Sequence, residues 1–346
     1  MYSLNSLIEN KNIQVDKTKY FSAIIGESPS KGAKSPTLWN EAFKKINFPS
    51  FMHPIDILPK NLGELIKNLR LNKRFIGGAV TMPYKIDILK FLDHVDDNAK
   101  VIGAVNCIYR GNNGELIGTN TDGAGALWSL KSVYGDLNEA KVLLVGAGGA
   151  ALAVATYIAK SLGKKGKLFI SNRSKEKLLI LKKKLSKNAC GVDLLSWPPP
   201  IEKAKEFDII INCTSIGFEN LKKDSKGIYS LKFFTPLGHI NNITRVPECN
   251  NPQKEYVFKA VTEISKNIIE TTRFLSQCKN TMVFDVIYQP RTTYLLFLSD
   301  LLGLKTLSGK KMNLEQAVIA FDKTTSATGL RNSDQDEVRK LMEKVS

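Results

Sequence analysis

The stretch that most restricts the fold is an apolar run broken by glycines, "VLLVGAGGAALAVATYIA", residues 142–159. Its length approaches that of a membrane span, but three glycines and a threonine interrupt it. A buried strand, a tight turn and a buried helix account better for the pattern. Because strand and helix patterns alternate through much of the chain, the sequence predicts an α/β fold with a parallel sheet around this segment.

The turn inside this run has the context of a dinucleotide-binding loop. Glycines at 146, 148 and 149 stand between the predicted strand and the predicted helix. Glycine lets the backbone turn tightly and approach a pyrophosphate, and the amino end of the helix can then bind the phosphates. Similar turns also serve only to pack a helix against a strand, so a structural role stays open.

The next predicted strand, "KLFISNR", bears on the choice of cofactor. NAD sites usually place an acid at the end of this strand, where it binds the ribose 2′-hydroxyl. Here the strand ends in Asn172 and Arg173, and no acid comes before Glu176. A 2′-phosphate is bound best by a guanidinium with further cationic help, and Arg173 and Lys177 supply both. The sequence therefore predicts NADP rather than NAD.

Two residues of the first half are candidates for acid–base chemistry. "FIGGAVTM" is typical of a short buried strand, and "PYKIDILKFLDHV" predicts a helix with proline in its first turn. If Thr81 caps that helix, Lys85 lies near the positive end of the helix dipole, which suits a proton donor or acceptor. An exposed amine is the alternative. Asp122 follows two strands, "VIGAVNCIYRG" and "ELIGTNTDG", joined by the turn "GNNG". Spacing alone does not show whether Asp122 meets Lys85.

Composition narrows the classes of function. The net charge of +17 suits anionic small molecules, nucleic acid or an acidic membrane surface, but no nucleic-acid-binding motif is present. The five cysteines are widely spaced without CxxC, and the three histidines form no HxxxH pair, so neither a disulfide framework nor a metal site is expected. The N-terminus lacks an apolar core of signal-peptide length, which predicts a cytoplasmic protein.

Several short motifs follow one another in a specific order. They are "GGAVTMPYK", "IGAVN", "GTNTDG", "VGAGGA", "SNRSKEK", "INCTSIG", "DVIYQPRTTYLL" and "GKKMNLEQAVIAF". In this order, and over roughly residues 20–325, the set resembles the shikimate dehydrogenase family. The resemblance implies a substrate domain, a Rossmann-type NADP domain and a catalytic lysine–aspartate dyad that needs no metal. By motif, the dyad is Lys85 and Asp122.

The resemblance also implies domain boundaries and an activity. We expect a substrate-binding catalytic domain at 1–123, completed by 309–346, and an NADP-binding domain at 124–308 with an inserted segment at about 218–280. The implied reaction is the reversible NADP-dependent reduction of 3-dehydroshikimate to shikimate, in the biosynthesis of chorismate and aromatic amino acids, by a monomer or homodimer. The alternatives are a dehydrogenase of quinate or another cyclic polyol carboxylate, and a non-catalytic sensor on the same fold.

Further site residues are carried over from the family motifs. For the substrate the resemblance implies Ser35, Thr81, Asn106, Tyr288 and Gln316. For NADP it implies Gly146, Ala147, Gly148, Gly149, Ala150, Asn172, Arg173 and Thr214, with Ser174 and Lys177 beside them.

The chain departs from the family pattern at two positions that bear on the substrate. Where the family has the sequence HSxSP, this chain has "GAKSP", so Ala33 replaces the first of two serines that bind the substrate carboxylate. Ala79 stands where the family has the asparagine of NVTxPxK. Ser30, Lys31 and Lys34 are nearby candidates to replace the lost hydroxyl. These departures leave the exact substrate open.

Overall fold

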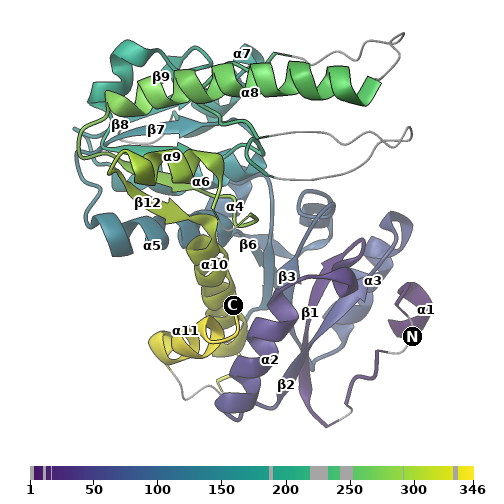
Figure 1. Cartoon of the computed structure of the whole chain (residues 1–346). Helices are drawn as coiled ribbons and strands as arrows, with labels where there is room; N and C mark the ends of the chain where they lie inside the picture. Colours follow the sequence, from purple (N-terminus) through teal and green to yellow (C-terminus); the bar gives the residue numbers. More distant parts are fainter. Residues whose placement is uncertain are drawn as a thin grey trace. The chain divides into compact units, whose positions relative to one another are not determined.

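A computed structural model describes residues 4–10, 13–16, 18–186, 190–218, 233–241, 252–290, 292–329 and 334–346. The chain divides into two compact units: unit 1 comprises residues 1–125 and 313–346, and unit 2 comprises residues 126–312. Each unit contains its own six-stranded sheet (Figure 1). The sequence predicts the domain boundaries at residues 123 and 308.

Unit 1 is built on a mixed sheet with the strand order β2-β1-β3-β5-β6-β4. The strands are β1 (Tyr20–Gly26), β2 (Ser50–Asp56), β3 (Phe75–Val80), β4 (His94–Val95), β5 (Cys107–Arg110) and β6 (Leu116–Thr119). β1 pairs in parallel with β2 and β3, whereas β5 runs antiparallel to β3 and β6. The strand pair predicted around "GNNG" is confirmed as β5 and β6.

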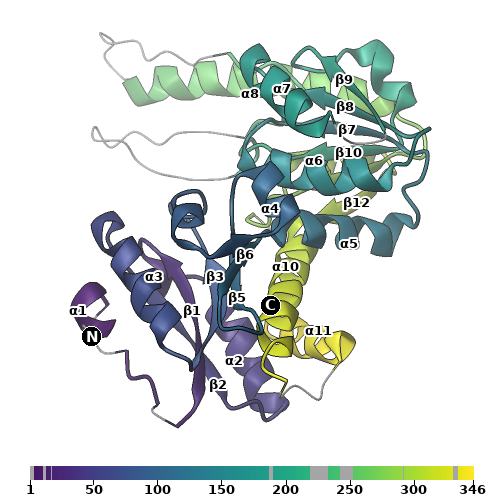
Figure 2. The same ribbon diagram turned by 180° about the vertical axis from the view of Figure 1, so that it is seen from behind.

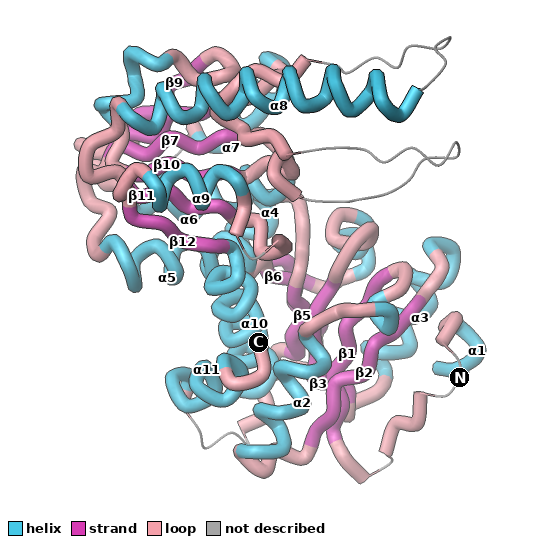
Figure 3. The backbone as a smooth tube through the Cα atoms, viewed as in Figure 1, coloured by secondary structure: helices cyan, strands magenta, loops and turns pink. Residues whose placement is uncertain are grey.

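Helices cover both faces of the unit 1 sheet (Figure 3). They are α1 (Leu4–Leu7), α2 (Ser35–Lys45), α3 (Leu62–Leu71), α4 (Asp97–Ile102), the later part of α10 (Gly309–Ser326), and α11 (Gln335–Glu343). Side chains of a strand alternate between faces, so Phe21 and Ile25 of β1 join the cluster with α3. Ile24 joins the opposite cluster, where Trp39 of α2 packs 5.2 Å from Phe321 of α10 between ring centroids.

Unit 2 is built on an entirely parallel sheet with the order β12-β11-β10-β7-β8-β9. The strands are β7 (Lys141–Val145), β8 (Lys167–Ser171), β9 (Gly191–Leu195), β10 (Ile209–Asn212), β11 (Met282–Asp285) and β12 (Lys305–Ser308). With β7 as the first strand, this is the strand order 3-2-1-4-5-6 of a Rossmann sheet. Successive strands are added on one side of β7 as far as β9 and on its other side from β10 onward, so the strand order reverses between β7 and β10. In such sheets ligands bind beyond the carboxyl ends of the strands at that point.

Two layers of helices enclose the unit 2 sheet. They are α5 (Asp122–Tyr134), α6 (Gly149–Ser161) and α7 (Lys175–Leu185) on one face, and α8 (Pro252–Ser276) and α9 (Tyr294–Leu301) on the other (Figures 1 and 2). Val142 and Leu144 of β7 pack toward the first layer, whereas Leu143 and Val145 pack toward the second. The apolar run 142–159 thus forms β7 and α6, as predicted. Throughout the described ranges, no helix combines the length and the apolarity that crossing a membrane requires.

The segment expected as an insertion, 218–280, lies partly outside the described residues, which omit 219–232 and 242–251. Its later part forms α8, which stands in the chain between β10 and β11. These two strands are parallel neighbours, and a parallel pair needs a crossover connection. α8 therefore supplies that connection.

The predicted helix over "PYKIDILKFLDHV" is wrong. Residues 82–86 form turns, a short 3-10 helix covers Asp87–Phe91, and β4 pairs with β6. Tertiary contacts explain the difference. The Tyr84 hydroxyl donates to the Ile57 carbonyl at 2.5 Å. The Lys85 carbonyl accepts from the Val105 N–H at 2.7 Å, whereas in a helix it would accept from a backbone N–H of the next turn. Lys85 is therefore not placed by a helix dipole.

Candidate active site

The segments that carry the predicted dyad meet at one edge of the unit 1 sheet. Ala79, near the end of β3, pairs with Cys107 at the start of β5, and Cys107 in turn pairs with Thr119 at the end of β6. The residues that follow β3, precede β5 and follow β6 therefore emerge together. This register brings Lys85 and Asp122 to the same place, although they lie far apart in the sequence.

Lys85 and Asp122 form an ion pair. The Lys85 Nζ donates to Asp122 Oδ2 at 2.7 Å, and the two side chains are 32% and 22% exposed. This exposure leaves the ammonium accessible to a ligand and to solvent. The Asp122 N–H also donates to Asn120 Oδ1 at 3.2 Å, which fixes the start of α5. An ammonium that a carboxylate holds in place in this way is suited to donate a proton.

Asn106 fixes the other oxygen of Asp122. Its Nδ2 donates to Asp122 Oδ1 at 2.8 Å and to Thr121 Oγ1 at 3.0 Å, while its Oδ1 accepts from the Thr121 N–H at 2.7 Å. Asn106 is only 4% exposed. A longer contact of 3.4 Å joins its Nδ2 to Gln316 Oε1 of α10. Three predicted site residues, Asn106, Asp122 and Gln316, are thus brought together, and Thr121 is a participant that the sequence analysis missed.

The paired glycines before this loop are required by the packing of β3. Gly77 and Gly78 have φ values of 126° and 150°, and a Cβ on Gly78 would overlap the backbone of Ala23 in β1. A Cβ on Gly77 would overlap the backbone of Ile108 in β5. The two glycines therefore let β3 lie against both neighbours, which sets the register of the site.

The other residues predicted to bind substrate lie in different places, and Gln316 has a further contact of its own. Ser35 is half-buried at the first position of α2, and Thr81 is half-buried directly after β3. Gln316 is held by a hydrogen bond from its Nε2 to the Asn313 carbonyl at 3.0 Å. Tyr288 belongs to unit 2, where it follows β11 and is 45% exposed.

One candidate replacement for the lost serine is already engaged within unit 1. The Ser30 N–H donates to Asp56 Oδ1 at 2.9 Å, and its hydroxyl donates to Asp56 Oδ2. Because that proton is used within the protein, Ser30 is a poor donor to a substrate carboxylate. Lys31 and Lys34 are both exposed on the same loop.

A pocket of about 210 Å³ lies at the carboxyl edge of the unit 2 sheet. It is lined by residues of the loops after β7, β8, β9 and β10, namely Gly146, Ala147, Gly148, Asn172, Arg173, Trp197, Cys213, Thr214, Ser215 and Ile216, together with Val145, the last residue of β7. The register aligns Val145 with Ser171 and with Asn212, so these loops start at one level. The pocket therefore occupies the place where Rossmann sheets bind ligands.

The glycine loop fits a dinucleotide. Gly146 has a φ of 121°, and a Cβ there would come within 3.0 Å of the Cys213 backbone. Gly148 and Gly149, by contrast, face open space, so a phosphate can approach the backbone at the amino end of α6. Ala150, in the first turn of α6, is exposed.

The residues after β8 have distinct positions. Asn172 Nδ2 donates to the Ser174 carbonyl at 3.1 Å, and the Ser174 hydroxyl caps α7 by accepting from the Lys177 N–H at 3.3 Å. Arg173 lines the pocket, whereas Ser174 and Lys177 do not. Within the described part of the chain, no residue that lines the pocket carries a carboxylate, which suits an anionic ligand.

Thr214 is held by a buried network that continues behind the pocket. The Asn212 Oδ1 accepts from both the N–H and the hydroxyl of Thr214, at 2.9 and 2.7 Å, and its Nδ2 donates to Asp285 Oδ1 at 3.0 Å. The Thr293 hydroxyl donates to Asp285 Oδ2 at 2.7 Å. Burial raises the pKa of Asp285 to about 6, against these donors, which lower it. The network fixes the loop that carries Thr214.

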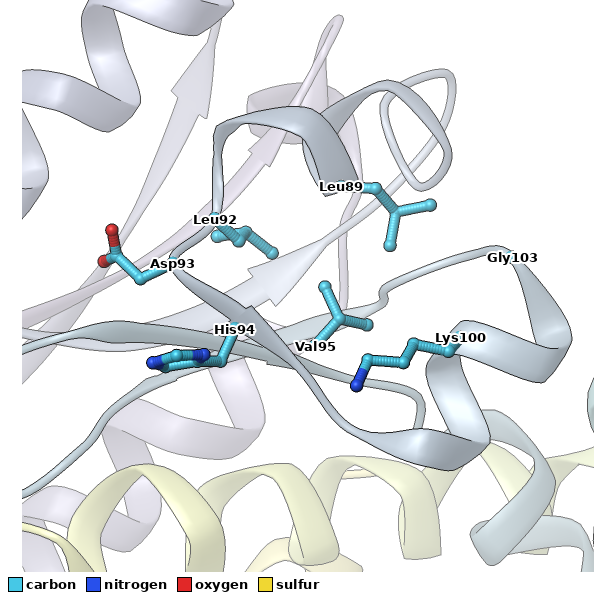
Figure 4. Close-up of a pocket in the computed structure, with 7 residues that line it drawn as sticks. All are labelled: Leu89, Leu92, Asp93, His94, Val95, Lys100 and Gly103. Atoms are coloured by element: carbon cyan, nitrogen blue, oxygen red, sulfur yellow. The ribbon is translucent and has the colours of Figure 1, made fainter.

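Unit 1 has a second pocket, of about 460 Å³, between the 3-10 helix Asp87–Phe91 and α4. Its apolar side chains, Leu89, Leu92 and Val95, point into a common space, whereas Asp93 points away from it (Figure 4). Asp93 pairs with Arg70 at 3.0 Å. None of the seven lining residues belongs to the dyad or to its hydrogen-bond partners. Across the described part of the chain, no cluster of His, Cys, Asp and Glu is arranged to hold a metal ion.

Comparisons with known proteins agree with the fold of the two units. The family model described as "Shikimate dehydrogenase substrate binding domain" matches residues 24–108, and that described as "Shikimate / quinate 5-dehydrogenase" matches residues 129–225. The NADP(+) shikimate dehydrogenase of Bacillus licheniformis is 31% identical over 301 residues, which cover 86% of this chain and 89% of the relative. That of Methanocaldococcus jannaschii is 32% identical over 305 residues, covering 88% and 90%.

Solved structures show the same fold. A crystal structure of a shikimate dehydrogenase in complex with NADP+ aligns with a TM-score of 0.67 at 26% identity, covering 96% of this chain and 98% of that chain. The shikimate 5-dehydrogenase of Listeria monocytogenes, in complex with shikimate and NAD, aligns with a TM-score of 0.71 at 24% identity, covering 96% and 100%. A 5-ketofructose reductase of Gluconobacter aligns with a TM-score of 0.67 at 23% identity, covering 95% and 99%. The last two likenesses establish the fold alone. The first of these proteins was solved with NADP+ and the second with shikimate and NAD, and the fold occurs in enzymes named for different substrates.

Proposed function

This chain belongs to the shikimate dehydrogenase family of oxidoreductases, and on that premise we propose that it is an NADP-dependent shikimate dehydrogenase. The reaction is the reversible reduction of 3-dehydroshikimate to shikimate, a step in the formation of chorismate and aromatic amino acids. The observation that carries the proposal is the Lys85–Asp122 ion pair, fixed by Asn106 at the edge of the unit 1 sheet.

The chemistry divides between the cofactor and the dyad. When bound, NADPH supplies the hydride that adds to the ketone carbon. As the carbonyl double bond opens, negative charge develops on the oxygen, where the Lys85 ammonium stabilises it and donates a proton. Hydride and proton together convert the ketone to the alcohol. Asp122 holds the ammonium at 2.7 Å, and Lys85, about one third exposed, regains a proton from solvent.

The substrate carboxylate needs its own donors. We assign Ser35 to this role, with the exposed cations Lys31 and Lys34 on the preceding loop in place of the missing serine hydroxyl. A charged donor binds a carboxylate more strongly than a hydroxyl does. The net charge of +17 also favours the encounter with two anionic ligands, a carboxylate and a dinucleotide phosphate.

The preference for NADP is supported by the unit 2 pocket. Among the described residues that line it, Arg173 is the one cation, and Asn172 takes the place where NAD sites usually have an acid. A guanidinium can make paired hydrogen bonds to a 2′-phosphate, which a 2′-hydroxyl does not match. The pocket therefore favours NADP.

A second candidate substrate is quinate or another cyclic polyol carboxylate. Ala33 and Ala79 remove two polar groups that the family pattern places near the substrate, and Asp56 engages the hydroxyl of Ser30. A site with fewer fixed donors discriminates less strongly between related hydroxy acids. A non-catalytic sensor is less favoured, because a sensor has no need of an intact dyad and glycine loop.

A panel of substrates and cofactors tests the proposal. We expect kcat/KM for shikimate with NADP+ to exceed that for quinate by roughly tenfold to a hundredfold, the usual discrimination for one altered hydroxyl. We expect NADP+ to exceed NAD+ by about tenfold or more, because charged hydrogen bonds are lost with NAD+. Initial rates of NADPH or NADH formation provide the measurement. A preference for quinate would establish the second candidate, and no turnover of any member would contradict an enzymatic role.

A further inference from the structure

Trp197 lies beside Arg173 at the carboxyl edge of the unit 2 sheet. β8 and β9 run parallel, with Ser171 opposite Leu195, and Arg173 and Trp197 each follow two residues later. The register therefore brings the two side chains to one level. The Arg173 Cζ lies 5.5 Å from the centroid of the Trp197 ring, which is within the range of a cation–π contact. Both residues line the pocket of about 210 Å³.

The protein holds the Trp197 ring in place. Its Nε1–H donates to the Pro236 carbonyl at 3.0 Å, and its carbon atoms pack against the apolar cluster beneath α8 and α9. The Ser171 hydroxyl donates to the Ser196 carbonyl at 2.6 Å, which fixes the preceding residue to the end of β8. Arg173 itself is exposed and long, so a fixed aromatic face reduces the freedom of its guanidinium.

A guanidinium held over an aromatic ring can keep its N–H donors available for a ligand. A guanidinium stacks through its face, whereas its N–H groups point outward in the plane. In the described ranges, no acid forms an ion pair with Arg173. An oriented cation with available N–H donors matches the geometry of a phosphate monoester.

We propose that Trp197 is a positioning residue for cofactor selectivity. It holds the Arg173 guanidinium so that the N–H edge meets the phosphate on the 2′-position of the cofactor ribose. The inference rests on the proposed use of NADP. NAD carries a hydroxyl at this position and gains little from an oriented guanidinium. Trp197 therefore contributes to the ratio of the two affinities rather than to both equally.

The test is calorimetric titration of the full-length protein with NADP+ and with NAD+. In Trp197→Leu, which keeps an apolar side chain without the π face, we expect the Kd for NADP+ to rise by about 5- to 30-fold. The Kd for NAD+ should stay within about twofold of wild type, since NAD+ has no 2′-phosphate for Arg173 to bind. With saturating substrate, the KM for NADPH should rise while kcat stays unchanged. Trp197→Phe keeps an aromatic face and should recover most of the selectivity.

The matched control is Trp128→Leu. Trp128, also in unit 2, carries the Lys311 ammonium 5.4 Å from its ring centroid, but it does not line the pocket. Its replacement should leave the ratio of the two Kd values unchanged. Circular dichroism and thermal unfolding show whether each variant folds. If Trp197→Leu does not fold, Trp197→Phe still tests the proposal, because it should keep most of the selectivity for NADP+.

A double-variant cycle separates positioning from a general structural role. Because Trp197 acts through Arg173, Trp197→Leu should add little to the loss already caused by Arg173→Gln. Fully additive losses, or equal weakening of NADP+ and NAD+ by Trp197→Leu, would overturn the proposal. A wild type without any preference for NADP+ would overturn both this proposal and the cofactor part of the proposed function. A wild type that prefers NADP+, with the same preference in Trp197→Leu, would overturn the role of Trp197 alone.

Discussion

Replacement of Lys85 by alanine is expected to lower kcat by about 10²- to 10⁴-fold, because the variant loses the group that protonates the ketone oxygen. Binding of NADPH should stay within about twofold of wild type, since the residues that line the cofactor pocket belong to unit 2. Initial rates of NADPH oxidation at saturating substrate measure the first effect. Titration of NADPH fluorescence measures the second.

Lys90→Ala is the matched control for this experiment. Lys90 lies in the neighbouring 3-10 helix, its side chain is 64% exposed, and its 3.8 Å ion pair with Asp87 is on the surface. Exposed pairs of this kind contribute little, so both turnover and stability should be unchanged. Near-normal turnover of Lys85→Ala would refute the assignment of Lys85 as the proton donor.

Replacement of Arg339 by methionine is expected to destabilise unit 1 by about 3–5 kcal/mol, because it removes the cation that pairs with a buried carboxylate. The Arg339 Nε lies 2.9 Å and 3.0 Å from the two carboxylate oxygens of Glu315, and the Glu315 side chain is 1% exposed. The free energy of unfolding from urea denaturation, followed by circular dichroism, measures the effect. The chain has two compact units, so the transition of unit 1 should be resolved by a second probe, such as the fluorescence of Trp39 in a background where Trp128 and Trp197 of unit 2 are replaced by phenylalanine.

The double variant Glu315→Leu/Arg339→Met separates charge from packing. Apolar replacement of both partners of a buried ion pair is often close to neutral, so the double variant should recover most of the lost stability. If the double variant were as unstable as Arg339→Met, the loss would come from packing, and the buried charge would not be its cause. The Glu315–Arg339 ion pair also lies next to the candidate active site along α10, because Glu315 directly precedes Gln316, whose Oε1 contacts Asn106.

The sequence predicts the chemistry of each half because the relevant motifs are local. A glycine turn between a strand and a helix predicts the β7–α6 unit. The lack of an acid beside Arg173 predicts a cofactor with a 2′-phosphate, NADP, rather than NAD. Whether Lys85 meets Asp122 could not be predicted from spacing, since the register of β3, β5 and β6 decides it. Only the resemblance to a family paired the two residues before the fold was known.

Other features could not be read from the sequence because long-range contacts determine them. The helix predicted after "VTM" does not form, since Tyr84 bonds to Ile57 and the Lys85 carbonyl bonds to Val105. β9 could not be predicted either, because its first residue is exposed, the others are half-buried, and clear alternation is lacking. Without β9, nothing in the sequence placed Trp197 beside Arg173.

The most direct test of the central claim is the transfer of labelled hydride. The purified protein is incubated with 3-dehydroshikimate and with NADPH that carries deuterium at the transferable position of the nicotinamide, and the product is examined by NMR and mass spectrometry. The account predicts shikimate with a single deuterium on the new carbinol carbon, formed in equal amount to NADP+, and almost none from Lys85→Ala. Absence of shikimate, or shikimate without the label at that carbon, would contradict it.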